Sequence, residues 1–334
     1  MDPWTTFQSS VQLIGGIAAL VANSVLLLLI FTKSPKNLGA YKYLMIYICL
    51  FQLAYAILDI LLHADIHTKD SCWIVALNSQ KTILPPRTLY IFDLLYCGSF
   101  GISLANFGVH FIFRYLVVKG AKQWTSPRTV FFWQSMSLLY GTIWTVLCHV
   151  FLQRSNTADN FLRKEVIKDS KTNLTDIAYL GFCFYKDPDE HGKQEINWWS
   201  VTGTLSFSSL LSFSSIIMFV FGSKCYLLIK NMVNQTAYSP KFREVQSQLF
   251  NALVFQTMIP FVMMHIPCAL VYVCAMIGGA PMFFGRTLTI TVAIFPALDP
   301  LPNMFIIRDY RLSKTHVLLG KACKSTERKD HGNH

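Results

Sequence analysis

Seven long apolar runs limit what this 334-residue chain can fold into. Each run contains at least 20 residues without Lys or Arg. About 20 apolar residues in a helix are needed to cross the hydrocarbon core of a bilayer, which is about 30 Å thick. The runs therefore predict an all-α membrane protein, a bundle of seven transmembrane helices. They cover residues 9–31, 43–62, 89–113, 129–152, 199–222, 249–276 and 287–307.

Prolines interrupt the last two runs. Pro260 and Pro267 lie in the sixth, and the seventh contains Pro296, Pro300 and Pro302. Because proline has no N–H to donate to the helical ladder, we expect a bend in the sixth helix and an irregular inner end of the seventh.

The distribution of charge predicts the orientation. No Lys or Arg precedes the first run, whereas Lys33 and Lys36 follow it, which places the amino terminus outside. The cytoplasmic segments then hold 18 basic and 4 acidic residues, and the outer segments hold 11 of each. The net charge of +11 therefore reflects an inner face attracted to anionic lipids, and we expect no nucleic-acid partner.

The outer segments carry two signals for covalent modification. Asn173-Leu-Thr175, in the long segment 153–198, is a glycosylation acceptor sequence on the outer side. Cys72 and Cys183 are the two cysteines that fall in outer segments, where the compartment is oxidising. We expect these two cysteines to form a disulfide.

Polar side chains inside the spans are costly and should face protein or water. Asn23 and Asp299 lie at about the same depth, roughly 20 Å from the outer surface, with Asn303 one turn below Asp299. They predict a polar cluster in the middle of the bundle. Such a cluster either holds helices together or forms a hinge that rearranges, and the sequence leaves both interpretations open.

A second set of side chains, which are polar or belong to methionine, lies near the outer ends of the spans. Together they can line an outward-facing cavity that is mostly apolar and suits a small ligand. For each single residue, the alternative is an ordinary interfacial position. The candidate ligand-binding residues are Asp59, His63, Tyr90, Asp93, Tyr96, Met263, Met264, His265 and Arg286.

The inner ends of the third and seventh runs contain candidate signalling elements. Residues 108–115 include His110, Arg114 and Tyr115. An Arg at this boundary is most often a topology marker that snorkels to the headgroups, and the functional alternative is a switch where a partner enters. Residues 308–323 predict an amphipathic inner-leaflet helix with Cys323 as a candidate palmitoylation site, followed by a disordered cytoplasmic tail, 324–334.

Signals for catalysis are weak. His63 and His67 have the i, i+4 spacing of a zinc motif, but no acidic residue directly follows the first histidine. The sequence has no Gly-x-Ser-x-Gly elbow and no phosphate-binding Gly-rich loop. We therefore expect no enzyme activity, no metal and no cofactor.

Four motifs in order resemble one receptor family. They lie at residues 36–45, 108–115, 248–260 and 296–309. Over almost its whole length, the chain resembles the nematode seven-transmembrane chemoreceptors of the Str class, the group that includes the diacetyl odorant receptor. The resemblance implies a bundle of the G-protein-coupled receptor type that binds a small volatile or water-soluble molecule. It also implies coupling to a heterotrimeric G-protein alpha subunit in the plasma membrane of sensory cilia of chemosensory neurons.

More distantly, three positions resemble the rhodopsin-like receptors. Asn23 is similar to their span-one Asn, Asp299-Pro300 to their span-seven Asn/Asp-Pro pair, and Arg114-Tyr115 to the Arg-Tyr of their span-three motif. The chain departs from that pattern where Phe113 replaces the acid before Arg114, Asn303 replaces the Tyr that closes the span-seven motif, and Leu89 stands at the position of the upper Cys of span three.

The resemblance implies an activation mechanism in which the ligand favours a state whose sixth span, bent at Pro260, has swung outward. The candidate residues for activation and coupling are Asn23, His110, Arg114, Tyr115, Pro260, Asp299, Pro300 and Asn303. Two other classes remain open. One is a seven-helix ligand-gated channel with its amino terminus inside, and the other is a multi-pass transporter, although no internal repeat supports it.

Overall fold

The computed structural model describes residues 3–34, 38–167, 172–188, 191, 193–232 and 239–311. Most of the predicted amphipathic helix 308–323, with Cys323, and the tail 324–334 lie outside the described residues, as does part of the motif at 36–45.

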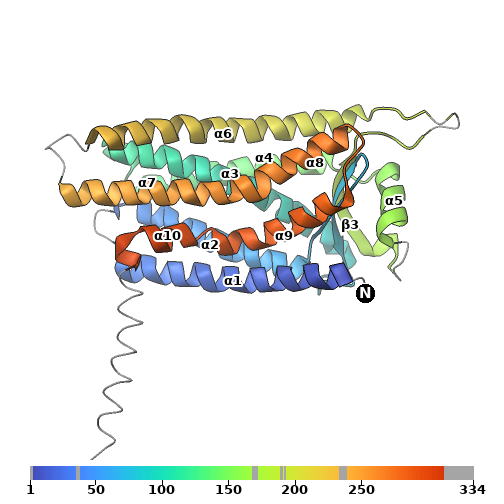
Figure 1. Cartoon of the computed structure of the whole chain (residues 1–334), viewed down its shortest axis with the longest axis horizontal. Coiled ribbons are helices and arrows are strands. Elements are labelled where there is room, and N and C mark those ends of the chain that lie inside the picture. Colours follow the sequence, from blue (N-terminus) through green and yellow to red (C-terminus); the bar gives the residue numbers. More distant parts are fainter. Residues whose placement is uncertain are drawn as a thin grey trace, which may run out of the picture.

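Within these residues, seven helical segments are long and apolar enough to cross a membrane, which confirms the predicted bundle. They run side by side along the long axis of the molecule (Figure 1). The spans are α1 (Pro3–Lys33), α2 (Tyr41–Leu62), α3 (Pro86–Lys119), α4 (Pro127–Phe151) and α6 (Trp198–Met232), then α7 (Pro240–Pro260) with α8 (Ile266–Met276), and α9 (Met282–Leu298) with α10 (Leu301–Ile306).

Local sequence explains several helix ends. A proline occupies the first position of α3, α4 and α7, where its missing N–H breaks no helical hydrogen bond. Gly120 ends α3 with a φ of 80°, a left-handed conformation that glycine adopts without strain. At the start of α7, the Ser239 hydroxyl accepts a hydrogen bond from the backbone N–H of Phe242.

A three-stranded antiparallel sheet, which we call the outer sheet, covers the outer end of the bundle. It consists of β1 (Asp65–Lys69), β2 (Cys72–Asn78) and β3 (Ile177–Cys183), in the order β1-β2-β3. Cys72 and Cys183 occupy directly opposed positions of β2 and β3 and are joined by a disulfide. The short helix α5 (Asn156–Leu162) packs against the outward face of this sheet. The predicted all-α fold did not include this sheet.

The sixth span is interrupted at its predicted bend. Pro260 is the last residue of α7, and a π-helical turn, Phe261–His265, separates α7 from α8. Pro267 then lies in the first turn of α8. Because neither proline supplies an N–H, the ladder loses two hydrogen bonds within two turns, and a π-helical turn is a common result. The seventh span breaks similarly between α9 and α10, at Asp299 and Pro300.

Two large apolar clusters form the core. One lies beneath the outer sheet and joins it to α2, α3, α4, α6, α8 and α9. The other lies near the cytoplasmic end, around α1, α2, α3, α4, α7 and α10. Apolar side chains on the periphery, such as Phe131 and Phe219, remain largely exposed, as a lipid-facing surface requires.

Candidate functional site

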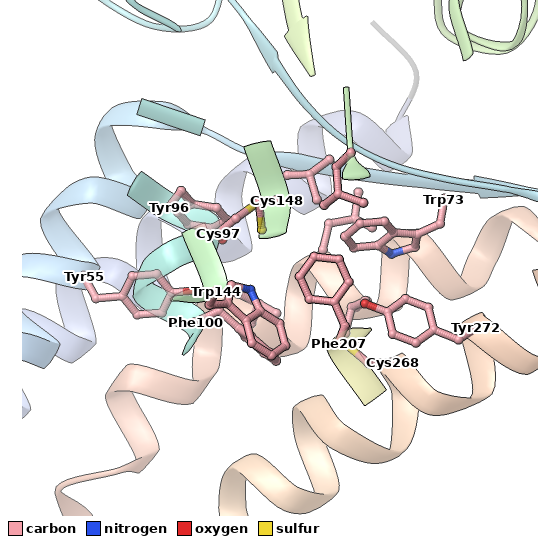
Figure 2. Close-up of a pocket in the computed structure, with 15 residues that line it drawn as sticks. Tyr55, Trp73, Tyr96, Cys97, Phe100, Trp144, Cys148, Phe207, Cys268 and Tyr272 are labelled. Atoms are coloured by element: carbon pink, nitrogen blue, oxygen red, sulfur yellow. The ribbon is translucent and has the colours of Figure 1, made fainter. Parts of the chain in front are cut away.

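A cavity of about 70 Å³ lies inside the outer apolar cluster, directly under the outer sheet. Its walls are mostly aromatic and aliphatic, and three thiols are among the groups that face it (Figure 2). The lining residues are Tyr55, Ile66, Trp73, Val75, Tyr96, Cys97, Phe100, Trp144, Cys148, Leu152, Phe207, Cys268, Tyr272, Leu288 and Val292.

The alternation of β2 explains how the sheet contributes to this cavity. Successive side chains of a strand point to opposite faces. Trp73 and Val75 therefore point into the bundle and line the cavity, whereas Cys72 and Ile74 belong to the apolar cluster on the outward face. The disulfide fixes β2 to β3, and so holds Trp73 above the helices.

Aromatic packing fixes the walls. The ring of Trp73 lies edge-on to that of Tyr272 in α8, with centroids 5.8 Å apart. Trp144 in α4 packs at 5.0 Å against Phe207 in α6. The cavity is thus bounded by side chains from most of the bundle, and movement of α8 changes its shape directly.

Polar groups at the cavity are few. The Tyr96 hydroxyl donates a 2.9 Å hydrogen bond to Oδ1 of the buried Asp59. The indole N–H of Trp73 is buried and has no hydrogen-bond partner among the described residues. Cys97, Cys148 and Cys268 are free thiols. This arrangement suits a small, largely apolar molecule, with one or two hydrogen bonds available to orient it.

The sequence-predicted ligand residues are only partly brought together. Tyr96 lines the cavity, and Asp59 joins it through the Tyr96 hydroxyl. Seven others lie outside its lining. Within the described structure these are His63, Tyr90, Asp93, Met263, Met264, His265 and Arg286.

The positions of these seven explain why they fall outside. His63 caps α2 in a left-handed conformation, φ 47°, and Tyr90 shares a 3.0 Å hydrogen bond with His149 at the outer rim. Asp93 is fully buried, one turn outward of Cys97. His265 turns back to donate a 3.0 Å bond to the carbonyl of Pro260. Arg286 lies over the ring of Trp4 at 5.6 Å.

Met263 and Met264 belong to the π-helical turn itself. The i, i+4 geometry considered for His63 and His67 does not exist, because α2 ends at Leu62 and His67 lies in β1. No group of three or more His, Cys, Asp or Glu side chains that could hold a metal occurs within the described parts of the chain.

Sequence reasoning missed the aromatic residues that form the walls, such as Tyr55, Trp144, Phe207 and Tyr272. Polar side chains are conspicuous within apolar spans, whereas aromatic residues there look the same in the sequence whether they face lipid, core or cavity. The run Cys72–Leu77, which contains Trp73, Ile74 and Val75 and directly follows Asp70-Ser71, was the available signal for a strand.

A central polar cluster joins spans one, six and seven. The Asn23 side chain donates a 2.9 Å hydrogen bond to the carbonyl of Pro296. The amide of Gln256 in α7 donates at 2.8 Å to Oδ2 of Asp299, and Asn303 donates at 3.0 Å to Oε1 of Gln256. Asn23 therefore bonds the Pro296 carbonyl and not Asp299, and Gln256, which was not among the predicted site residues, connects the acid to Asn303.

At the cytoplasmic end, Arg114 is fully buried without an acidic partner among the described residues. Its guanidinium lies 5.0 Å from the centroid of the Tyr41 ring and donates a 2.9 Å hydrogen bond to the carbonyl of Gln246 in α7. The Tyr41 hydroxyl shares a 3.2 Å hydrogen bond with Nδ1 of His110. Arg114 does not snorkel; it bridges α3, α2 and α7. Its neighbour Tyr115 packs edge-on against Phe221 of α6.

Comparison with known proteins identifies the family. The model for the serpentine type 7TM GPCR chemoreceptor Str matches residues 8–313. The chain belongs to this family. The G-protein coupled receptor str-217 of Caenorhabditis elegans is 30% identical over 312 residues, which cover 92% of this Str chemoreceptor and 88% of the relative. The serpentine receptor class r-10 of the same organism is 26% identical over 324 residues, covering 95% and 93% of the two chains.

The fold of this Str chemoreceptor is also that of the rhodopsins. Squid rhodopsin superposes with a TM-score of 0.63 and 12% sequence identity, covering 100% of this chain and 93% of that one. The resemblance noted in the sequence is confirmed: the protein is a multi-pass membrane protein and a serpentine chemoreceptor of the G-protein-coupled type.

Proposed function

We propose that this Str chemoreceptor binds a small environmental molecule in the cavity under the outer sheet and activates a heterotrimeric G protein at its cytoplasmic face. The observation that carries the proposal is that the sixth span contacts both places. Cys268 and Tyr272 of α8 line the cavity, and the backbone of Gln246 in α7 holds Arg114.

The size and lining of the cavity support a small ligand. An apolar cavity of about 150 Å³ accommodates benzene, and the cavity here is about half as large, at 70 Å³. A molecule of a few non-hydrogen atoms fits as it stands, and a larger one requires the walls to move apart. Because α8 forms one wall, expansion pushes on the outer half of the sixth span.

The break at Pro260 supports movement of one half of the span relative to the other. Without a proline N–H, the carbonyl of Gln256 has no i+4 donor, so the ladder between α7 and the π-helical turn is weakened. An outward movement of α7 would withdraw the Gln246 carbonyl and open the surface around Arg114. We infer that the ligand acts by population shift, binding more tightly to the open state.

The test is a ligand screen in cells that express the chain with a promiscuous G protein, followed by two substitutions in α8. Cys268→Phe places a ring in the cavity, whereas Val273→Phe lies on the lipid-facing side, where Val273 is 59% exposed. We expect Cys268→Phe to raise the half-maximal ligand concentration at least tenfold at equal surface expression, and Val273→Phe to leave it unchanged. Equal responses of the two variants would contradict this ligand site.

We further propose a plasma-membrane location, in the sensory cilium of a chemosensory neuron, with the amino terminus outside. The charge distribution supports the orientation. An epitope tag at the amino terminus should be stained on intact cells, and a carboxyl-terminal tag only after permeabilisation. The opposite staining would favour a channel of inverted topology over a G-protein-coupled receptor.

A further inference from the structure

A second and larger hollow, which we call the inner groove, lies between α3, α4 and α6 in the cytoplasmic half of the bundle. Its volume is about 590 Å³, and nearly all the side chains that line it are apolar. Several of them, such as Leu139, Ile143 and Phe213, are about half exposed, so the groove opens sideways toward the bilayer.

Small residues and two hydrogen bonds define the groove. Ala105 and Gly108 of α3 and Ser214 of α6 leave space where longer side chains would meet. Above them, the Tyr140 hydroxyl donates a 2.8 Å bond to the carbonyl of Leu210 and ties α4 to α6. Below, the indole N–H of Trp133 donates a 3.0 Å bond to the carbonyl of Trp124 and closes the cytoplasmic end. These two hydrogen bonds therefore hold the walls of the groove together, one toward its outer end and one at its cytoplasmic end.

The length of the groove matches one leaflet of a bilayer. Its α3 wall extends from Ala105 to Leu116, which is about 17 Å at a rise of 1.5 Å per residue. Half of a hydrocarbon core about 30 Å thick is about 15 Å. A single acyl chain of an inner-leaflet lipid, lying parallel to the helices, has the length and the chemistry to occupy this space.

The charges at the cytoplasmic end of the groove are positive. Arg128 lies one turn before the groove residue Phe132 on the same face of α4, and Lys122 shares a helical turn with Trp124. On α6, Lys224 lies over the ring of Phe221, two turns below the groove residue Ile217. Among the described residues, none of these three cations forms an ion pair. They are placed to meet an anionic headgroup.

We propose that the inner groove is a binding site for one acyl chain of an anionic phospholipid of the cytoplasmic leaflet, whose headgroup contacts Lys122, Arg128 and Lys224. This site is separate from the cavity under the outer sheet and does not depend on which ligand binds there. Its occupant would pack against the segment of α3 that includes His110 and Arg114, and so would stabilise the spacing of α3, α4 and α6.

Photo-crosslinking tests the proposal. The full chain in phosphatidylcholine nanodiscs receives a small fraction of phosphatidylserine, or of phosphatidylcholine, with a diazirine near the end of one acyl chain. After irradiation, peptide mapping locates the adducts. We expect them to concentrate on residues 105–116, 132–143 and 213–217, with labelling by phosphatidylserine at least threefold greater than by phosphatidylcholine.

Two neighbouring substitutions in α4 provide a matched control. Leu139 lines the groove and Leu138 does not, yet the two side chains are similarly exposed, 54% and 50%. Leu139→Trp should reduce groove labelling at least threefold, and Leu138→Trp should preserve it. Replacing Lys122, Arg128 and Lys224 together by Gln should abolish the preference for phosphatidylserine but retain labelling.

Three results would overturn the proposal. They are adducts spread evenly over all lipid-facing helices, equal labelling by the two headgroups in the unmodified receptor, and groove labelling that persists in Leu139→Trp. Size-exclusion profiles that match the unmodified receptor establish that each variant is folded before its labelling is compared.

Discussion

Asn23 supplies the hydrogen bond that Pro300 removes. In a regular helix the carbonyl of Pro296 would accept from the backbone N–H four residues later, but residue 300 is a proline and has none. The Asn23 side chain of α1 donates to that carbonyl at 2.9 Å. A contact between spans one and seven thus replaces a bond within span seven, at the break between α9 and α10.

Asn23→Ala should therefore destabilise the receptor. It leaves a buried carbonyl unsatisfied, which costs about 1–3 kcal/mol. We expect a lower temperature of thermal inactivation for the purified variant. Thr32→Ala is the control, because Thr32 is exposed and its hydroxyl bonds only within its own helix. An unchanged inactivation temperature for Asn23→Ala would mean that the Pro296 carbonyl finds another donor.

Removal of the Tyr41 ring should raise basal signalling. A buried cation–π contact stabilises the position of a guanidinium by about 2 kcal/mol, which corresponds to a roughly 30-fold shift in an equilibrium. Tyr41→Leu removes this contact with Arg114, whereas Tyr41→Phe retains the ring and loses only the bond to His110. We expect second-messenger output per surface receptor to rise severalfold in the first variant and little in the second. Equal output would show that Tyr41 does not restrain Arg114.

The bundle was predictable from the sequence, but most of the site was not. Span length follows from the thickness of the bilayer, so the apolar runs were sufficient to predict the seven helices. Asn23 and Asp299 could be placed at one level because helical rise converts residue counts into depth. Gln256 lies within the motif at residues 248–260. Only the structure, which shows the face of α7 that points toward span seven, reveals that its amide donates to Asp299.

The cavity and the outer sheet could be identified only from the three-dimensional arrangement of the chain. Trp73 and Tyr272 are 199 positions apart in the sequence, and their contact depends on the pairing of β2 with β3. In a loop between helices, the sequence can suggest that a segment forms a strand, but it does not show which other strand pairs with it. The sequence shows that no acid precedes Arg114. It does not show that the ring of Tyr41 and the backbone carbonyl of Gln246 contact the guanidinium instead.

Loss of the disulfide should loosen the outer sheet. Cys72 and Cys183 are 111 residues apart, and a crosslink across so long a loop can contribute up to about 4–5 kcal/mol. We expect Cys72→Ser to reduce surface expression and weaken ligand responses, because Trp73 is no longer fixed. Cys274→Ser, which removes a free thiol, should have little effect. Non-reducing peptide mapping that finds Cys72 as a free thiol in the unmodified receptor would contradict the prediction.

Acidic pH should loosen the outer sheet through His67 in β1. Burial lowers the pKa of His67 below its ordinary value of 6.5; Asp65 opposes this shift, whereas Lys81 and Arg286 add to it. The unfolded strand then binds the proton more tightly, so local stability is lost as pH falls below about 6.5. Hydrogen exchange in β1 should accelerate relative to β3 between pH 7.5 and 5.5, after correction for intrinsic rates. In His67→Gln this dependence should diminish, and an identical pH profile would assign it to another group.

The break at Pro260 separates the two ends of the sixth span, so its removal tests the link between cavity and cytoplasmic face. Pro260→Ala supplies the N–H that the carbonyl of Gln256 lacks, and should extend the regular ladder through the π-helical turn. We expect normal or higher surface expression, because the helix gains a hydrogen bond, together with a markedly smaller ligand-stimulated response. Pro240→Ala is the matched control in the same span, since Pro240 occupies the first position of α7 and breaks no ladder bond. A full response from Pro260→Ala would show that bending at this proline is not part of activation, and the transmission from α8 to Gln246 and Arg114 would then have to occur by movement of the whole span.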